Sequence, residues 1–355
     1  MKIEILRELK PEVEKCWLEK WNAWPTGHVF NHPRWFRVIQ EALPHRGSLL
    51  IRAVSKNRDL VFMAAEQIER GLQLAGAPYL DKASILCDPE LSPDEWHQFV
   101  LALLERFDWL CFQELSPTIS QAADIELKRA WAARKYSSAN PWFFIDSPSV
   151  SPKQRHELRR FTRLLEKQAP VEFVLKKLAP DDLEIMTAIE RGSTKVDRRK
   201  AVLDNDDFRA WIRAFIKHFN ENCWLSLLLL NGEPIAHYAG VAYKSRLLGF
   251  HMAFLKEYAR FSPGSVLVFN ILPLLRVHGF KEFDYGRGHS VMKRRFAGDN
   301  NMAQWNLYYF KKDWRGIAKR VRTEITWGLI GVGRLLRTVG KRRITPILDR
   351  LAVRR

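Results

Sequence analysis

Long apolar runs are missing from this sequence. Stretches such as residues 224–230 fall far short of the roughly 20 residues that a membrane-spanning helix needs. Residues 1–10 mix charged and apolar side chains and lack the apolar core of a secretion signal. These absences exclude a transmembrane protein and predict a cytoplasmic location.

Cysteine is also scarce, with only Cys16, Cys87, Cys111 and Cys223 in the whole chain. The four are dispersed, without a Cys-x-x-Cys pair or a nearby pair of histidines. The sequence therefore predicts neither a disulfide framework nor a zinc site, and no metal cofactor. Three of the four stand beside large apolar residues, so we expect buried thiols in a reducing compartment.

Acidic residues are too few to balance the basic ones. The chain has 58 Lys and Arg against 40 Asp and Glu, a formal charge of +18. Residues 311–355 carry 14 of the basic and three of the acidic residues, so the rest of the chain is only mildly basic. Such a segment attracts polyanions, including nucleic acid, anionic lipid and acidic polysaccharide, although a basic surface kept for solubility explains it equally well.

Length and composition predict a folded protein of two domains, since 46% of the 355 residues are hydrophobic and 28% are charged. The stretch 146–152 is rich in Ser and Pro, which interrupt regular structure. We place the boundary there. The predicted units are an N-terminal lobe over 1–146, a C-terminal lobe over 151–311 and a basic helical tail over 312–355.

Strands and helices are mixed in both predicted lobes. The apolar periodicity and turn signals of the first lobe predict strands over 48–54, 60–67, 71–76, 109–113 and 141–145, and helices from Ser92 and over 125–136. Those of the second predict helices over 153–168, 182–191, 206–220 and 265–278, and strands over 171–175, 223–230, 234–243, 246–255, 282–285 and 303–310. This pattern predicts an α/β (α+β) fold.

The loop over 260–264 leads into a helix whose first residues are small. The backbone amides of Gly264, Ser265 and Val266 are therefore candidates for binding an anion at the helix N-terminus. An ordinary helix capped by Ser262 is the alternative, and the local sequence by itself favours it.

Several motifs together resemble one family. They are Phe30-Asn31-His32-Pro33-Arg34-Trp35-Phe36, Leu158-Arg159-Arg160, Leu230-Asn231-Gly232-Glu233-Pro234-Ile235-Ala236, Ser262-Pro263-Gly264, His278-Gly279-Phe280, Phe283-Asp284-Tyr285-Gly286-Arg287-Gly288 and Met292-Lys293. The sequence resembles the acetyltransferase domain of the CelD/BcsL-like family, in the GNAT superfamily and close to the FemAB aminoacyl transferases. The resemblance covers residues 28–310 and is strongest over 150–300.

This resemblance implies two tandem GNAT-like lobes, each a mixed, mostly antiparallel sheet flanked by helices. The second lobe would hold acetyl-CoA or another acyl-CoA, with its pantetheine arm along the strand 247–255 and its pyrophosphate at 260–266. The implied donor-binding residues are His251, Arg260, Ser262, Gly264, Ser265 and Val266. The phosphate loop is one residue longer than the superfamily pattern and lacks one of its glycines.

The resemblance also places the chemistry around the glycine turn at 286–288. Lys293 and the backbone amides near 286–288 are candidates for stabilising the oxyanion of an acyl transfer or a substrate phosphate. His289, His251 and His237 are candidate bases because imidazole titrates near neutral pH, and His289 is preferred. Asp284 is a base, an orienter of the acceptor or a cap on the turn, and the cap is the commonest of these. Met292 stands where the family usually has Tyr.

Candidate acceptor-binding residues are Trp35, Arg159, Arg160, His237 and Arg287. For Arg159 and Arg160 the alternative is a solvated helix face, and for His237 and His251 it is a satisfied place in the core. No Ser-His-Asp or Cys-His arrangement is recognisable, so direct transfer is preferred over a covalent enzyme intermediate.

Three functions remain open. The first is acyl-CoA-dependent N- or O-acyl transfer to an amine or hydroxyl of a cell-envelope, polysaccharide or related acceptor. The second is FemAB-like aminoacyl transfer from charged tRNA, which the positive charge favours. The third is a non-catalytic accessory role in a membrane-associated assembly. Apolar residues at helical spacing from Trp314, with basic residues between them, predict that the tail binds an anionic membrane surface or a protein partner.

Overall fold

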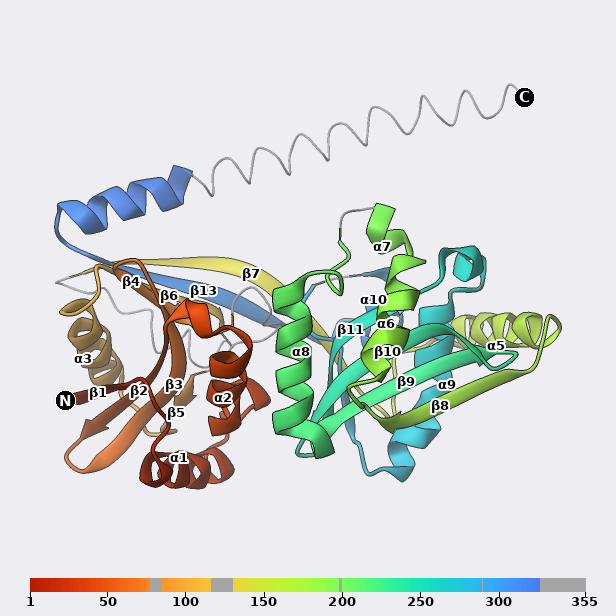
Figure 1. The fold of residues 1–355 in the computed structure, drawn as a ribbon, viewed down its shortest axis with the longest axis horizontal. Coiled ribbons are helices and arrows are strands. Elements are labelled where there is room, and N and C mark those ends of the chain that lie inside the picture. Colours follow the sequence, from red (N-terminus) through yellow and green to blue (C-terminus); the bar gives the residue numbers. More distant parts are fainter. Residues whose placement is uncertain (77–84, 116–129, 198–199, 289, 326–355) are drawn as a thin grey trace.

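The structure is a computed structural model that describes residues 1–76, 85–115, 130–197, 200–288 and 290–325. Two lobes lie side by side and are joined by two long strands (Figure 1). A single thirteen-stranded sheet runs through both lobes in the order β1-β2-β3-β4-β6-β13-β7-β12-β11-β10-β9-β8, and β5 pairs with β3. The fold is the mixed α/β class expected from the sequence.

The two longest neighbouring strands, β7 and β13, lie near the middle of the sheet. The strands are β1 (Lys2–Leu6), β2 (Ser48–Ser55), β3 (Arg58–Ile68), β4 (Gly71–Leu74), β5 (Leu86–Cys87), β6 (Trp109–Leu115), β7 (Ala130–Phe144), β8 (Val171–Lys177), β9 (Cys223–Leu230), β10 (Glu233–Tyr243), β11 (Arg246–Phe254), β12 (Glu282–Asp284) and β13 (Asn301–Lys311).

The helices pack on the faces of this sheet. They are α1 (Pro11–Ala23), α2 (Pro33–Ala42), α3 (Pro93–Leu104), α5 (Pro152–Glu166), α6 (Asp182–Arg191), α7 (Thr194–Asp197), α8 (Asp206–Phe219), α9 (Pro263–Val277) and α10 (Val291–Ala297), with 3-10 turns η1 (Val29–Asn31), η2 (Pro44–Arg46), η3 (Asn220–Asn222) and η4 (Lys256–Phe261). Residues 314–325 are also helical.

Local sequence signals determine several element ends. Ser92 begins α3 with a capping box, in which its hydroxyl accepts from the Glu95 amide and the Glu95 carboxylate accepts from the Ser92 amide. Ser151 begins α5 in the same way. The turn Asn231-Gly232 has positive φ at both residues, as the tight hairpin between β9 and β10 requires.

The helix expected over 125–136 is wrong wherever the structure describes it. Residues 125–129 lie outside the described residues, and 130–136 form the start of β7. The Ala, Arg and Lys of this stretch favour a helix locally, but its side chains alternate in exposure with the period of a strand. Pairing with β13 along residues 130–141 stabilises the strand and overrides the local preference.

The two long strands β7 and β13 cross from one lobe to the other (Figure 1). β13 lies between β6 of the first half and β7, and pairs antiparallel with both. The chain thus returns to the first half of the sheet before it enters the helix 314–325.

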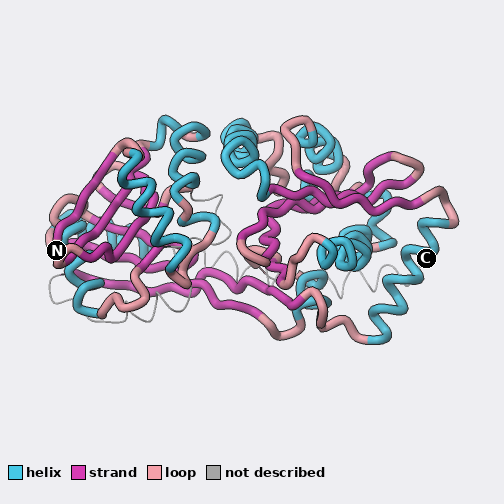
Figure 2. Tube along the Cα trace, turned by 90° about the horizontal axis from the view of Figure 1, so that it is seen from below, coloured by secondary structure: helices cyan, strands magenta, loops and turns pink. Residues whose placement is uncertain are grey.

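In the second lobe the sheet lies between two groups of helices (Figure 2). Leu225 and Ala239 face the core that contains α6 and α8, whereas Leu228 and Tyr238 face the core that contains α5 and α9. α8 also packs against α2 of the first lobe, so that first core is continuous across both lobes. No helix in the described part of the chain is long and apolar enough to cross a bilayer.

Gly249 gives a test of how tightly β11 is packed. A Cβ at this position would lie 1.7 Å from the Tyr238 hydroxyl oxygen. We expect Gly249→Ala to lower the free energy of unfolding by about 1–3 kcal/mol, because the buried Tyr238 ring, which packs against Phe283 and Tyr285, would have to shift. Denaturant unfolding measures this. In a Tyr238→Ala background the same change should add little; an equal loss in both backgrounds would contradict the steric account.

Candidate active site

β11 and β12 run in parallel for three residues and then separate. Residues 246–248 pair with 282–284, after which the chain follows β7, and the Gly288 amide donates to the Ala139 carbonyl at 3.0 Å. Among the described strands, β11 continues along β10 alone. Residues 249–254 therefore present a strand edge on the side where β12 has turned away.

A bulge lies at the start of this edge. His251 pairs with Ala239 and Gly249 pairs with Gly240, so Phe250 has no opposite residue on β10. A bulge bends a strand and increases its local twist. Here it directs β11 away from β12 at the point where their pairing stops.

Two of the three amides expected to bind an anion form hydrogen bonds within the first turn of α9. The amides of Ser265 and Val266 donate to the Ser262 carbonyl at 2.9 and 3.0 Å. The Gly264 amide is the one of the three expected donors that closes no such turn. Ser262 has φ 50° and ψ 51°, a left-handed conformation that is uncommon for a serine.

β11, α9 and α10 meet at Gly264. A Cβ on this residue would lie 3.0 Å from the Met252 sulfur and 3.4 Å from the Met292 sulfur. Glycine at this position thus lets the start of α9 lie against the open edge of β11. The structure brings the expected donor strand and the expected phosphate loop together.

Asp284 and Lys293 both hold the glycine turn. Asp284 is buried, and its Oδ1 accepts the Gly286 amide at 2.9 Å, the contact of a cap. Lys293 Nζ donates to the carbonyls of Gly286 and Arg287 at 3.2 and 2.7 Å. Arg287 contacts the buried carboxylate of Glu114, which belongs to the first half of the chain, at 3.2 Å.

Two buried histidines form a chain with a carboxylate on the α6 side of β10 and β11. His237 Nε2 lies 2.8 Å from His251 Nδ1, and His251 Nε2 lies 2.9 Å from Glu190 Oε1. Lys195 Nζ lies 3.2 Å from the same His251 nitrogen and 3.3 Å from Glu190 Oε1. Within the described residues no group of His, Cys, Asp and Glu is arranged to hold a metal ion.

The roles of the His251 nitrogens depend on its tautomer. Glu190 Oε2 accepts the amides of Val202 and Leu203. In one tautomer His251 Nε2–H donates to Glu190 and Nδ1 accepts from His237, whereas in the other Nε2 accepts from Lys195 and Nδ1–H donates to His237 Nε2. In the described structure the buried His237 Nδ1 has no hydrogen-bond partner.

The pKa shifts of these groups determine their charge. Burial raises the pKa of Glu190, but the hydrogen bond and charge of His251, with the Leu203 amide and Lys195, outweigh it and lower the pKa to about 2. Burial lowers the pKa of His251 to about 4 although Glu190 opposes it, and burial also holds the pKa of His237 well below its usual value. Both imidazoles are therefore neutral at pH 7.

Lys195 connects this cluster to solvent, since its side chain is 31% exposed on α7. The cluster also adjoins the expected donor loop. The Lys256 amide, at the start of η4, donates to the Gly192 carbonyl at 2.9 Å, which fixes the end of α6 against the end of β11. η4 then leads directly into Ser262.

The remaining candidate residues are Trp35, Arg159, Arg160, Arg260 and His289. Trp35 is 1% exposed between α2 and α8, so it has no surface for a substrate in this structure. Arg159 lines a cavity of about 320 Å³ between α5 and the second half of α9, away from Gly264. Arg160 and Arg260 cover the rings of their neighbours Phe161 and Phe261. His289 lies outside the described residues.

Sequence reasoning missed Glu190 and Lys195. One signal was available for Glu190: it shares a face of the amphipathic helix α6 with the buried Leu183 and Met186. A carboxylate at an apolar position needs a partner. Its partners come from β11 and α7, which the sequence alone does not bring together.

Residues 152–294 match the family model of the acetyltransferase (GNAT) domain. No curated protein matches the chain significantly. The matched stretch contains β8 to β12 with the open edge of β11, so the chain carries a GNAT-type acyltransferase fold.

Solved structures similar to the whole chain confirm the fold. FemX is 9% identical with a TM-score of 0.59, covering 87% of this chain and 97% of its own. The lysylphosphatidylglycerol synthetase of Bacillus licheniformis is 12% identical with a TM-score of 0.56, covering 89% and 96%. The C-terminal domain of a putative lysylphosphatidylglycerol synthetase from Agrobacterium fabrum is 14% identical with a TM-score of 0.54, covering 87% and 96%.

The buried histidines predict a pH dependence of stability. The unfolded chain binds a proton at residue 251 below about pH 6.5, but the folded chain binds it only near pH 4. The free energy of unfolding should therefore decrease as the pH is lowered from about 6.5 to about 4, by up to about 3 kcal/mol from this group.

Denaturant unfolding at pH 7 and pH 4.5 measures the effect. His251→Asn removes the titrating group, so the difference between the two pH values should be smaller than in the wild type. His156→Asn, on the exposed face of α5, should keep the wild-type difference. An unchanged pH dependence in His251→Asn would show that this imidazole is not held neutral by burial.

Proposed function

We propose that this protein is an acyl-CoA-dependent N- or O-acyltransferase, with acetyl transfer as the preferred reaction. The observation that carries this proposal is the open edge of β11 over 249–254 beside the Gly264 amide. A strand edge can pair with an extended amide-containing chain, and a pantetheine arm is such a chain. The Gly264 amide at the start of α9 would then lie beside the phosphates of the acyl-CoA, and Arg260 would be the nearby cation.

The proposed reaction is a direct transfer. The acceptor nitrogen or oxygen attacks the thioester carbonyl, the C–S bond breaks, and the proton lost by the acceptor ends on the departing thiol. We propose that Asp284 and Lys293 act by holding the glycine turn 286–288, so that its amides lie beside the developing oxyanion. His289 and the His237–His251 pair are the proposed proton acceptors, which return the proton to the departing thiolate.

The proposed acceptor is an amine or hydroxyl of a cell-envelope or polysaccharide intermediate. Arg287 remains a proposed acceptor contact because it follows the glycine turn. The ion pair between Arg287 and Glu114 supports an acceptor site to which both halves of the chain contribute. We propose a cytoplasmic protein that acts at the inner face of a membrane.

A second candidate is aminoacyl transfer from charged tRNA. The fold similarity to FemX favours it, together with the formal charge of +18. A third is a non-catalytic accessory role in a membrane-associated assembly.

Calorimetry with acetyl-CoA, free CoA and aminoacyl-tRNA distinguishes these functions. The leading proposal expects acetyl-CoA and CoA to bind at sub-millimolar concentration. Binding of aminoacyl-tRNA without binding of CoA would favour the second function, and binding of neither would favour the third.

Variants at the glycine turn test the mechanism. Lys293→Ala and Asp284→Asn should each lower turnover at least about tenfold without unfolding the protein, because the glycine turn is held less firmly and the oxyanion donors lose their position. Asp284→Asn keeps a neutral acceptor for the Gly286 amide, so its effect reports on the strength of that hydrogen bond. The control is Arg294→Ala, on the exposed side of α10. Unchanged turnover in both variants would place the site elsewhere.

A further inference from the structure

The helix over 314–325 presents an apolar stripe to solvent. Trp314, Ile317, Val321 and Ile325 follow one another at intervals of three and four residues and share one helix face. Their exposed fractions are 72%, 47%, 49% and 58%. In Figure 1 this helix lies at the upper edge of the first lobe, beyond the sheet.

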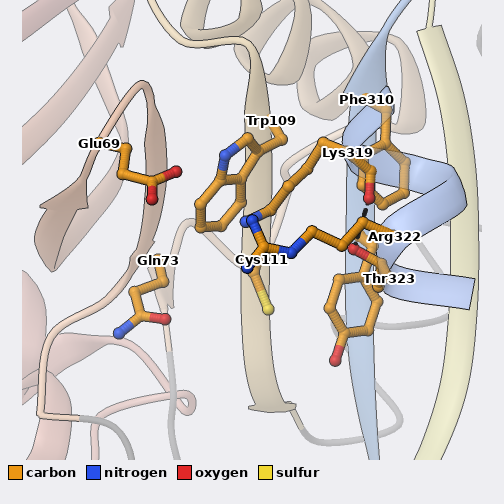
Figure 3. Close-up of a pocket in the computed structure, with 9 residues that line it drawn as sticks. Glu69, Gln73, Trp109, Cys111, Phe310, Lys319, Arg322 and Thr323 are labelled. Atoms are coloured by element: carbon orange, nitrogen blue, oxygen red, sulfur yellow. Dashed lines mark hydrogen bonds between the residues drawn. The ribbon is translucent and has the colours of Figure 1, made fainter. Parts of the chain in front are cut away.

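The opposite side of the same helix faces the protein and is polar. Lys319 Nζ lies 4.2 Å from the centre of the Trp109 ring. Lys319, Arg322 and Thr323 line a cavity of about 310 Å³ together with Trp109 and Cys111 (Figure 3).

The helix is therefore inverted relative to an ordinary surface helix, which buries its apolar face and exposes its polar one. A contiguous apolar stripe left in water is a feature of surfaces that bind another phase or molecule. The sheet beneath does not cover the stripe, so its binding surface points outward.

The charge around the stripe identifies what covers it. Residues 311–325 contain six basic and two acidic side chains, and Arg315 lies with its guanidinium 5.1 Å from the Trp314 ring. An apolar face edged by Lys and Arg, with a tryptophan among its members, fits the boundary between acyl chains and anionic headgroups. A second copy of the chain would bring a like charge, and a nucleic acid would leave the four apolar side chains uncovered.

We infer that the face of helix 314–325 formed by Trp314, Ile317, Val321 and Ile325 docks the protein on an anionic lipid bilayer. The helix lies in the plane of the headgroups, with the apolar stripe towards the acyl chains and Lys319 towards the sheet. This inference concerns location and does not depend on which acyl donor is used.

The test is flotation of the full-length protein with vesicles of phosphatidylcholine alone or with about 30% phosphatidylglycerol. Binding is expected to the anionic vesicles and to weaken as salt is raised. Ile317→Ser/Val321→Ser should weaken binding at least about tenfold, since two apolar side chains leave the interface. Leu18→Ser/Val277→Ser changes exposed apolar residues elsewhere and should bind like the wild type.

Circular dichroism and thermal unfolding check that the variants are folded, which is expected because all four positions are exposed. Wild-type binding by Ile317→Ser/Val321→Ser would overturn the inference and assign any binding to another part of the chain. Failure of the wild type to bind anionic vesicles would overturn it too. Light scattering adds one more overturning result: a wild-type dimer that the double variant abolishes would assign the stripe to self-association.

Discussion

The candidate site depends on how β7 is shared between its neighbours. Along most of its length β7 pairs with β13, but over its last residues, 142–144, it pairs with β12. The chain after β12 stays with β7, since the Tyr285 amide donates to the Pro141 carbonyl. This pairing draws the chain after β12 away from β11, and the open edge, the position of the glycine turn and the junction of the two lobes all follow from it.

Polar contacts fix the two sides of that opening. On one side, Asp284 and Lys293 hold the glycine turn through backbone groups, so their contribution is shape. On the other side, Glu190 and two neutral imidazoles form a buried chain that ends at Lys195. A buried network of this kind is expensive unless every member has a partner, and the unpartnered His237 Nδ1 is where it departs from that rule.

Much of the second lobe was predictable because its signals are local. Asn231-Gly232 and Ser151 act through their own turn or cap, and the predicted strands and helices around them are confirmed. The helix predicted for residues 130–136 was wrong because these residues pair with a strand about 170 residues later in the chain. For the same reason Glu190 was missed. Gly264 was found through its motif, but only the structure shows that a side chain there would crowd Met252 and Met292.

Hydrogen exchange of the β11 amides tests the central claim most directly. If an acyl-CoA adds to the open edge, amides within 249–254 should become protected when acetyl-CoA is added, together with the Gly264 amide. Amides of β9, inside the same sheet, should not change. Protection elsewhere without any change in β11 would contradict the account of this edge as the donor site.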